Sequence, residues 1–172
     1  MARKKVTDYL EEQRRIAIFA DVQNIYYTVR EQYRRQFDYQ ALWNEIRHFG
    51  EINFAAAYAV DRNEPNQKKF QHKLREIGFD VKLKPYIQRA DGSSKGDWDV
   101  GITIDVMEEA ENADIVVLAT GDGDFAPLVE RIKERFQVSV WIVSVSTLTA
   151  KHLIDVADRH FPINGEMLIN RP

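Results

Sequence analysis

The strongest constraint on the fold is a regular alternation of short apolar runs with longer amphipathic segments. Five runs have the length and apolar character of strands buried in a sheet: 15–21, 52–60, 80–86, 113–120 and 138–146. Helical patterns occupy the intervals, at 22–35, 38–50, 63–78, 98–111, 125–136 and 148–158, and an extended piece, "HFPIN", follows the last of them. Strands that alternate with helices predict an α/β fold with a doubly wound, mainly parallel sheet, helices on both faces and right-handed crossovers.

Acidic residues follow two of the predicted strands at the point where each strand ends. Asp21 closes the run 15–21, and "TGDGDF" (120–125) places Asp122 and Asp124 directly after the run 113–120. In such sheets the ligand crevice lies at the carboxyl ends of the strands, where the strand order reverses. A strand order of 3-2-1-4-5 puts that point between the first and fourth strands, so these distant carboxylates are expected to meet.

A third acidic element, "KGDWDVGITID" (95–105), lies between the other two in sequence. Asp97 and Asp99 fall at the start of a helical pattern and point about 200° apart on the helix wheel, so one of them is expected to face the crevice. Asp99 is preferred, because it lies in the first turn and Trp98 beside it must find apolar contact. Asp105 is about 120° around the wheel from Asp99, which favours an ordinary helix position.

Convergent carboxylates repel one another unless a cation offsets their charge. Mg²⁺ and Mn²⁺ take oxygen ligands, and such ions activate water and stabilise charge on phosphoryl oxygens. A zinc hydrolase would need closely spaced histidines, and the four histidines of this chain form no such motif. An all-aspartate set therefore predicts a Mg²⁺ or Mn²⁺ site for phosphodiester or phosphate-ester chemistry.

Each acid also has an ordinary structural role that the sequence leaves open. Asp124 fits the N-cap of the helix at 125–136, Asp21 a turn at a strand end, and Asp97 a helix cap. The case for a site comes from the three elements together. "GDGDFA" matches the dinucleotide fingerprint formally, but its aspartates would face a pyrophosphate, and the next strand lacks a ribose-binding acid. No dinucleotide cofactor is expected.

Composition limits the alternatives further. Residues 15–165 suit one globular domain, flanked by a charged segment at 1–14, read as a tail or short helix, and a C-terminal tail at 166–172. The net charge of -3 argues against a generally basic nucleic-acid-binding surface but allows a local patch. The absence of cysteine excludes disulfides and thiolate sites. No apolar stretch approaches the ~20 residues of a membrane helix, and no signal peptide is evident, so a cytoplasmic protein is expected.

Taken together, "FADVQN" (19–24), "KGDWDVGITID" (95–105) and "TGDGDFAPLV" (120–129) resemble the motifs of the NYN domain, in the LabA-like branch of the PIN-like ribonuclease superfamily. The resemblance spans roughly residues 15–160 and implies a doubly wound α/β sheet with metal-dependent RNA cleavage. The acids and amide of the family pattern fall on Asp21, Asn24, Asp99, Asp122 and Asp124, with Lys95 ahead of Asp99. The extra acid, Asp97, leaves the choice between positions 97 and 99 open.

The resemblance and the residues predict the same roles. Asp21, Asp99, Asp122 and Asp124 would hold Mg²⁺ or Mn²⁺ directly or through water, and one of them would orient the attacking water. Asn24 would bond a phosphate oxygen, position Asp21 or cap the first helix. Lys95 would pair with the scissile phosphate or with a neighbouring aspartate. Ser144, at the end of the fifth strand, would touch the substrate or cap the next helix, and capping is the preferred role of Ser146.

RNA is the expected partner, and a homodimer is expected only because closed symmetric pairs are the commonest oligomers. Tyr26, Tyr27, Tyr86 and Trp98 could stack bases or pack in the core. Basic residues cluster in sequence and could guide a phosphate backbone or merely form a solvated face: Lys68, Lys69, Lys73, Arg75, Lys82, Lys84, Arg89 and Lys95. Two other functions remain: a non-catalytic RNA- or protein-binding regulator, and a phosphatase, disfavoured because no second acid stands two residues after Asp21.

Overall fold

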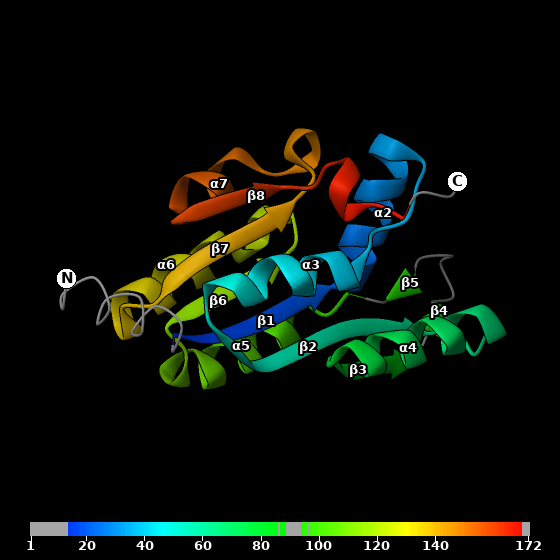
Figure 1. Ribbon diagram of the computed structural model, residues 1–172, viewed down its shortest axis with the longest axis horizontal. Helices are drawn as coiled ribbons and strands as arrows, with labels where there is room; N and C mark the ends of the chain where they lie inside the picture. The colour runs from blue at the N-terminus through cyan, green and yellow to red at the C-terminus, as the bar shows by residue number, and fades with distance from the viewer. Residues whose placement is uncertain (1–13, 86, 89–93, 96, 170–172) are drawn as a thin grey trace.

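The computed structural model describes residues 14–85, 87–88, 94–95 and 97–169. A six-stranded parallel sheet runs through the domain in the order β3-β2-β1-β6-β7-β8 (Figure 1). Its strands are β1 (Arg15–Asp21), β2 (Glu51–Asp61), β3 (Asp80–Pro85), β6 (Ile115–Ala119), β7 (Ser139–Ser144) and β8 (Arg159–Pro162). The predicted α/β class and the order 3-2-1-4-5 are confirmed, and β8 adds a sixth strand where the sequence indicated only an extended piece.

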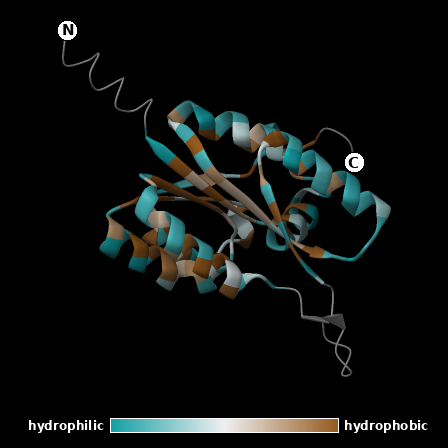
Figure 2. Ribbon diagram, turned by 90° about the horizontal axis from the view of Figure 1, so that it is seen from below, coloured by the Kyte–Doolittle hydropathy of each residue, from teal (hydrophilic) through white to brown (hydrophobic). Residues whose placement is uncertain are grey.

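Six α-helices cover the two faces of the sheet, as predicted (Figures 1 and 2). On one face lie α2 (Val22–Tyr33), α3 (Tyr39–Ile46) and α4 (Pro65–Ile77), and on the other α5 (Asp99–Glu109), α6 (Ala126–Phe136) and α7 (Lys151–Val156). Short 3-10 helices are η1 (Arg47–Phe49), η2 (Ala110–Asn112), η3 (Gly123–Phe125), η4 (Ser146–Leu148) and η5 (Gly165–Met167). A small antiparallel pair, β4 (Ile87–Gln88) and β5 (Ser94–Lys95), precedes α5. Within the described ranges, no helix has the length and apolar character needed to cross a membrane.

The continuous apolar run of β1 follows from its burial on both faces. Ile16 and Ile18 pack with the α2–α4 layer, and Ala17 and Phe19 pack with the α5–α7 layer. All four side chains are essentially inaccessible to solvent. Because successive side chains of a strand point to opposite faces, a strand covered by helices on both sides needs apolar residues at every position. The same argument accounts for β6, which is buried along its whole length.

Several element ends differ from the sequence reading. The single helix predicted at 148–158 is divided into η4 and α7, and η4 begins after Val145 without any side-chain cap, so Ser146 does not cap it. Residues 166–169, assigned to a C-terminal tail, pack on the domain: Leu168 is buried and forms a β-bridge with Phe37. Gly78 ends α4 as predicted, with a φ of 133° that favours glycine.

Candidate metal centre

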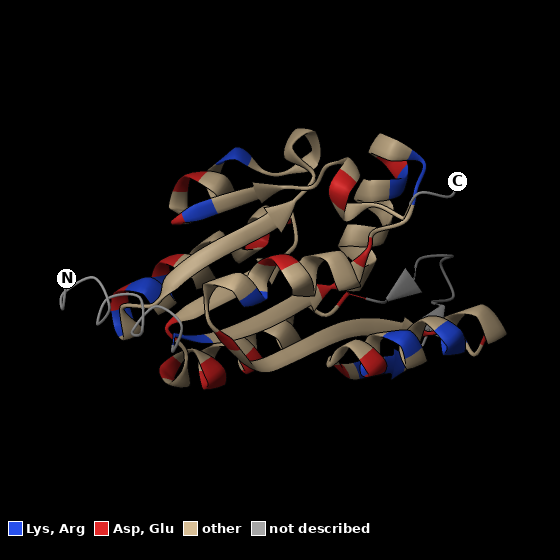
Figure 3. Cartoon of the chain, in the orientation of Figure 1, with Lys and Arg blue, Asp and Glu red and all other residues tan. Residues whose placement is uncertain are grey.

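The carboxyl ends of β1 and β6 lie side by side, so the acidic elements meet as the strand order predicted. Ala20 pairs with Ala119 across the two strands, and Asp21 and Thr120 follow them directly. Figure 3 shows acidic positions at this end of the sheet as well as elsewhere on the molecule. The acids therefore converge as the sequence predicted, because parallel strands bring the residues at their carboxyl ends to one edge of the sheet.

Three carboxylates form a compact group that is open to solvent. One oxygen each of Asp99, Asp122 and Asp124 lies within 4.8 Å of the others. Asp99 and Asp122 are partly exposed and Asp124 is exposed. Asp99 comes from the first turn of α5, and the other two come from the loop between β6 and α6. Oxygen atoms at this spacing fit a hard divalent cation that keeps part of its water shell.

Asp21 lies behind this group and is almost fully buried, with 8% of its surface exposed. Its Oδ2 accepts a hydrogen bond of 3.1 Å from the hydroxyl of Thr120. The same hydroxyl oxygen accepts one of 3.2 Å from the backbone N–H of Asp122. Thr120 thus couples the buried carboxylate to the loop that carries the exposed ones. Sequence reasoning missed this residue, although a hydroxyl side chain directly before "GDGD" was a usable signal.

Asn24 joins the start of α2 to the same loop. Its Oδ1 accepts a hydrogen bond of 2.9 Å from the backbone N–H of Gly121. The cap of α2 is Asp21, whose Oδ1 accepts from the backbone N–H of Asn24 at 3.5 Å. Of the alternatives that the sequence left open for Asn24, capping is therefore wrong. The side chain instead fixes the loop after β6 against the helix that follows β1.

The structure separates the two acids at the start of α5. Asp99 belongs to the three-carboxylate group, whereas Asp97 is exposed and its Oδ1 lies 3.4 Å from the backbone N–H of Asp99. Trp98 anchors this turn, because its indole N–H donates to the carbonyl of Ala59 at 2.9 Å and its ring packs on Tyr58. This anchoring directs Asp99 toward the loop after β6.

Asp122, rather than Asp124, is the capping residue of the loop. Its Oδ1 accepts a hydrogen bond of 2.9 Å from the backbone N–H of Asp124 and so caps η3. The helix α6 begins after Phe125 without a side-chain cap, so the predicted capping role of Asp124 is wrong. The carboxylate of Asp124 is consequently available to the acidic group. Asp122 combines both roles, since a carboxylate has two oxygens and the cap uses one.

His152 also belongs to the surroundings of this loop, although the sequence did not single it out. Its Nε2 lies 3.1 Å from the carbonyl oxygen of Gly123, between the two loop aspartates. A Cβ atom on Gly123 would come within 2.6 Å of the imidazole and 2.7 Å of Ala150. The glycine is therefore required by close approach of α7. A single histidine without a helix motif gave no sequence signal of this contact.

The remaining predicted site residues lie around the acidic group rather than in it. Ser144 is buried, and its hydroxyl contacts His160 Nε2 at 2.9 Å and accepts from the hydroxyl of Thr149 at 2.7 Å. Thr149 in turn lies against Gly121. Lys95 is in β5, where its backbone pairs with Ile87, and its side chain lies outside what the structure describes.

Two of the basic residues considered for guiding RNA have structural partners instead. Lys82 forms an ion pair of 2.7 Å with Asp105, which also accepts from the hydroxyl of Tyr58 at 2.8 Å. Lys84 lies 4.6 Å from the centre of the Trp98 ring and donates to the carbonyl of Asp97. Asp105 is thus the satisfied helix residue that the wheel predicted. Arg89 and Tyr86 lie outside the described residues.

Burial and mutual repulsion raise the pKa of two of the acids. Burial, reinforced by the charges of Asp122 and Asp97, raises the pKa of Asp21 to about 6, although its hydrogen bonds from Thr120 and Asn24 act in the opposite direction. Burial and the negative charges of Asp122, Asp21 and Asp97 raise the pKa of Asp99 to about 6. Carboxylates in this condition gain most from a bound cation, because the cation relieves both the repulsion and the desolvation.

Metal binding is therefore expected to weaken steeply as the pH falls through 6. Protons on Asp21 and Asp99 compete with the cation below a pKa of about 6, and binding should level off above it. The apparent affinity for Mn²⁺ should change by about tenfold per pH unit for each proton displaced. Titrations followed by quenching of tryptophan fluorescence would measure this, since Trp98 adjoins the site. Affinity that is equal at pH 5 and pH 7.5 would contradict the assignment.

Comparison with known proteins agrees with this geometry. The sequence pattern of the NYN domain matches residues 15–164. The low amplitude and bright protein LabA of Synechococcus elongatus is 28% identical over 158 residues, which are 87% of this chain and 84% of LabA. The crystal structure of a protein of unknown function from Vibrio parahaemolyticus superposes with a TM-score of 0.88 and is 50% identical. That match covers 92% of this chain and 98% of the other. The resemblance inferred from the three acidic motifs is confirmed, and the chain belongs to the NYN domain family.

Proposed function

We propose that this protein is a metal-dependent ribonuclease that hydrolyses phosphodiester bonds at the group of Asp99, Asp122 and Asp124, backed by Asp21. The observation that carries the proposal is the convergence of three carboxylate oxygens within 4.8 Å from two separate chain segments, with a fourth, buried acid tied to them through Thr120. Membership of the NYN family supports RNA as the substrate class.

Each acid has a distinct task in this proposal. Asp99, Asp122 and Asp124 would hold Mg²⁺ or Mn²⁺, because their oxygens are close together and open to solvent. When bound, such a cation lowers the pKa of a coordinated water and stabilises negative charge on phosphoryl oxygens. Asp21 supplies further negative charge and holds the loop through Thr120. One of these carboxylates would orient the attacking water.

Three further residues are assigned to substrate binding or its support. Asn24 uses its Oδ1 to hold the loop, which leaves its Nδ2 to donate to a phosphate oxygen. Lys95 precedes the acidic turn of α5 and would pair with the scissile phosphate. Ser144 would act indirectly, because its hydroxyl is buried and supports Thr149, which lies against Gly121.

The direct test is cleavage of a mixed panel of labelled RNA and DNA, single-stranded and duplex, by the purified protein. Reactions with Mn²⁺, Mg²⁺ and EDTA are run side by side. We expect cleavage of RNA in at least one of the two metals and none in EDTA. Negative charge develops on the phosphoryl oxygens during cleavage, and the carboxylates cannot stabilise it without a bound cation. Cleavage that persists in EDTA would overturn the proposal. Salt-dependent RNA binding without any cleavage would favour the non-catalytic regulator instead.

A further inference from the structure

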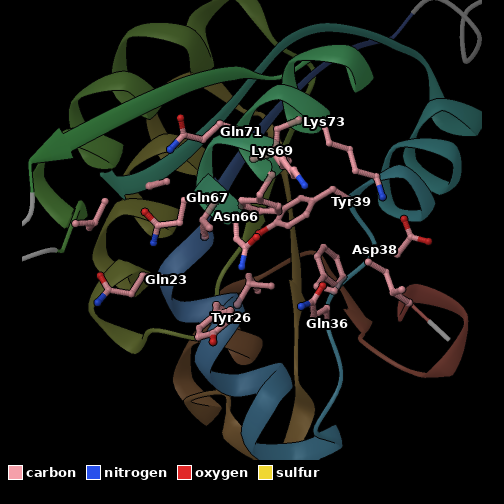
Figure 4. Close-up of a pocket in the computed structure, with 18 of the residues that line it drawn as sticks. Gln23, Tyr26, Gln36, Asp38, Tyr39, Asn66, Gln67, Lys69, Gln71 and Lys73 are labelled. Atoms are coloured by element: carbon pink, nitrogen blue, oxygen red, sulfur yellow. The ribbon is translucent and has the colours of Figure 1, made fainter. Parts of the chain in front are cut away.

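A cleft of about 550 Å³ opens between α2 and α4 (Figure 4). Ala59 and Val60, near the end of β2, line it together with Tyr39 of α3. Val22 and Gln23, the two residues that follow Asp21, also line it, so the cleft begins where the acidic site ends. Its volume is in the range of about 300–1,000 Å³ that is typical of pockets for small organic ligands.

Side-chain amides give this cleft its polar character. Gln23, Asn66, Gln67 and Gln71 all line it, and Figure 4 shows Gln23, Gln67 and Gln71 along one side. Gln71 is 6% exposed as a whole residue, no described residue hydrogen-bonds its amide, and the amide atoms keep contact with solvent where the residue lines the cleft. An amide that lines the cleft without a protein partner offers a ligand both a hydrogen-bond donor and an acceptor. Gln67 differs, since its Oε1 accepts from the backbone N–H of Arg62 at 3.0 Å.

The rim of the cleft combines aromatic and cationic side chains. Tyr26 and Tyr27 are each 48% exposed, although large aromatic side chains are normally covered. Lys69 and Lys73 project from α4 into the exposed margin and form no ion pair within the described ranges. Figure 3 shows basic positions along α4.

These features together fit one nucleotide of a single strand. Amide side chains form paired hydrogen bonds with the edge of a base, exposed aromatic rings stack on bases, and lysines attract the phosphate backbone. A paired base presents neither its Watson–Crick edge nor its faces, so a duplex could not place a base in the cleft. The occupant should therefore be an unpaired nucleotide, and its position beside Asp21 leads its own backbone to the metal centre.

We propose that the cleft between α2 and α4 binds an unpaired nucleotide of the RNA strand, with the base at Gln71 and the backbone along Lys69 and Lys73. The proposal rests on the ribonuclease function proposed above and adds selection for single-stranded RNA at a fixed distance from the cleaved bond. Tyr26 stacks on the same or the neighbouring base.

Binding measured without catalysis tests the cleft separately from the metal centre. Fluorescence anisotropy in EDTA follows a labelled single-stranded RNA with the full-length protein, its Gln71→Leu variant and its Lys69→Ala/Lys73→Ala double variant. The double variant should lower the log–log salt slope of binding by about 1 for each lysine removed. The matched control is Arg47→Ala/Arg131→Ala, which removes two exposed cations, one from η1 and one from α6. The control should retain the affinity of the wild type.

The role of Gln71 is read from base dependence. In a series of RNAs that each carry one abasic residue, binding to the wild type should weaken when that residue occupies one particular position. The Gln71→Leu variant should bind intact RNA about tenfold more weakly than the wild type does. An abasic residue at the same position should then cause the variant no further loss of affinity. Duplex RNA should bind weakly to every protein. Asn66→Ala, at an exposed position, repeats the test if Gln71→Leu melts abnormally.

Hydrolysis of bis(p-nitrophenyl) phosphate with Mn²⁺ separates the two proposals, because this ester has no base. Cleft variants that lose RNA affinity but keep this hydrolysis support the proposal. If the wild type does not hydrolyse the ester or RNA, the ribonuclease proposal fails while the binding data still judge the cleft. Equal RNA affinity of wild type and cleft variants would overturn the cleft proposal. The cleft proposal would also be overturned if a saturating concentration of a mononucleotide failed to displace labelled RNA from the protein.

Discussion

Replacing Asp122 by asparagine is expected to reduce metal-dependent cleavage of RNA by at least about 100-fold, because the change removes a ligand charge from the three-carboxylate group. Asparagine retains an Oδ1 that can accept from the backbone N–H of Asp124, as Asp122 does at 2.9 Å. The cap of η3 and the course of the loop should therefore persist. The variant thus removes the charge of residue 122 while the structure of the loop is kept. Initial rates of RNA cleavage with Mn²⁺ and with Mg²⁺ measure the loss of activity.

The matched control is Asp80→Asn, since Asp80 is exposed at the amino end of β3, the opposite end of the strands from the site. This variant should cleave RNA at the rate of the wild type, and both variants should show the circular dichroism of a folded α/β protein. Equal cleavage by wild type and Asp122→Asn would identify the activity as a contaminant and remove the carboxylates from the mechanism.

Replacing Asp21 by asparagine should increase the free energy of unfolding of the metal-free protein by about 3 kcal/mol near pH 7.5. The pKa of Asp21 is raised from 3.8 to about 6 in the folded protein, so the folded state retains its proton over a range in which the unfolded state has lost it. The contribution of Asp21 to stability is consequently greatest below pH 3.8, falls as the pH rises toward 6 and stays low above it. Asparagine carries no charge and is free of this cost.

The local hydrogen bonds allow this substitution. The Oδ1 of asparagine can accept from the backbone N–H of Asn24, and its Nδ2 can donate to the hydroxyl oxygen of Thr120. Urea unfolding in EDTA at several pH values measures the effect, with Asp80→Asn as the control. The advantage of Asp21→Asn should shrink between pH 6 and pH 4 and also in excess Mn²⁺, which binds the more negatively charged wild type more tightly and so stabilises it more. A variant less stable than the wild type at every pH would contradict the assigned electrostatic strain.

Stability and activity are thus expected to change in opposite directions at this site. The wild type keeps carboxylates close together at a cost in folding free energy, and a cation bound there would offset that cost. Such an arrangement is typical of functional sites and is hard to explain as a purely structural motif. Asp97 differs from the other acids, since it is exposed and its side chain faces the backbone N–H of Asp99.

The sequence by itself determined the sheet, its strand order and the end of the sheet where the acids meet. Strands such as β1 and β6 are buried on both faces and must be apolar at every position, so they are visible as continuous runs. Asp21, Asp122 and Asp124 follow such runs directly, and the parallel arrangement then brings them to one edge. These conclusions needed only short stretches of sequence, because an apolar run shows where a strand ends and the helix that follows it indicates a parallel crossover.

Only the tertiary structure decided which polar groups contact one another. The choice between Asp97 and Asp99 depends on which way a side chain points from the start of α5. The bridge through Thr120 and the bond from Gly121 to Asn24 join elements that are nearly 100 residues apart. The cleft between α2 and α4 likewise has no sequence signature, because Gln71 reads as an ordinary helix residue until β2 and α4 pack and bury it. Burial and distance are properties of the packed chain, and they convert a row of aspartates and glutamines into a candidate catalytic and RNA-binding surface.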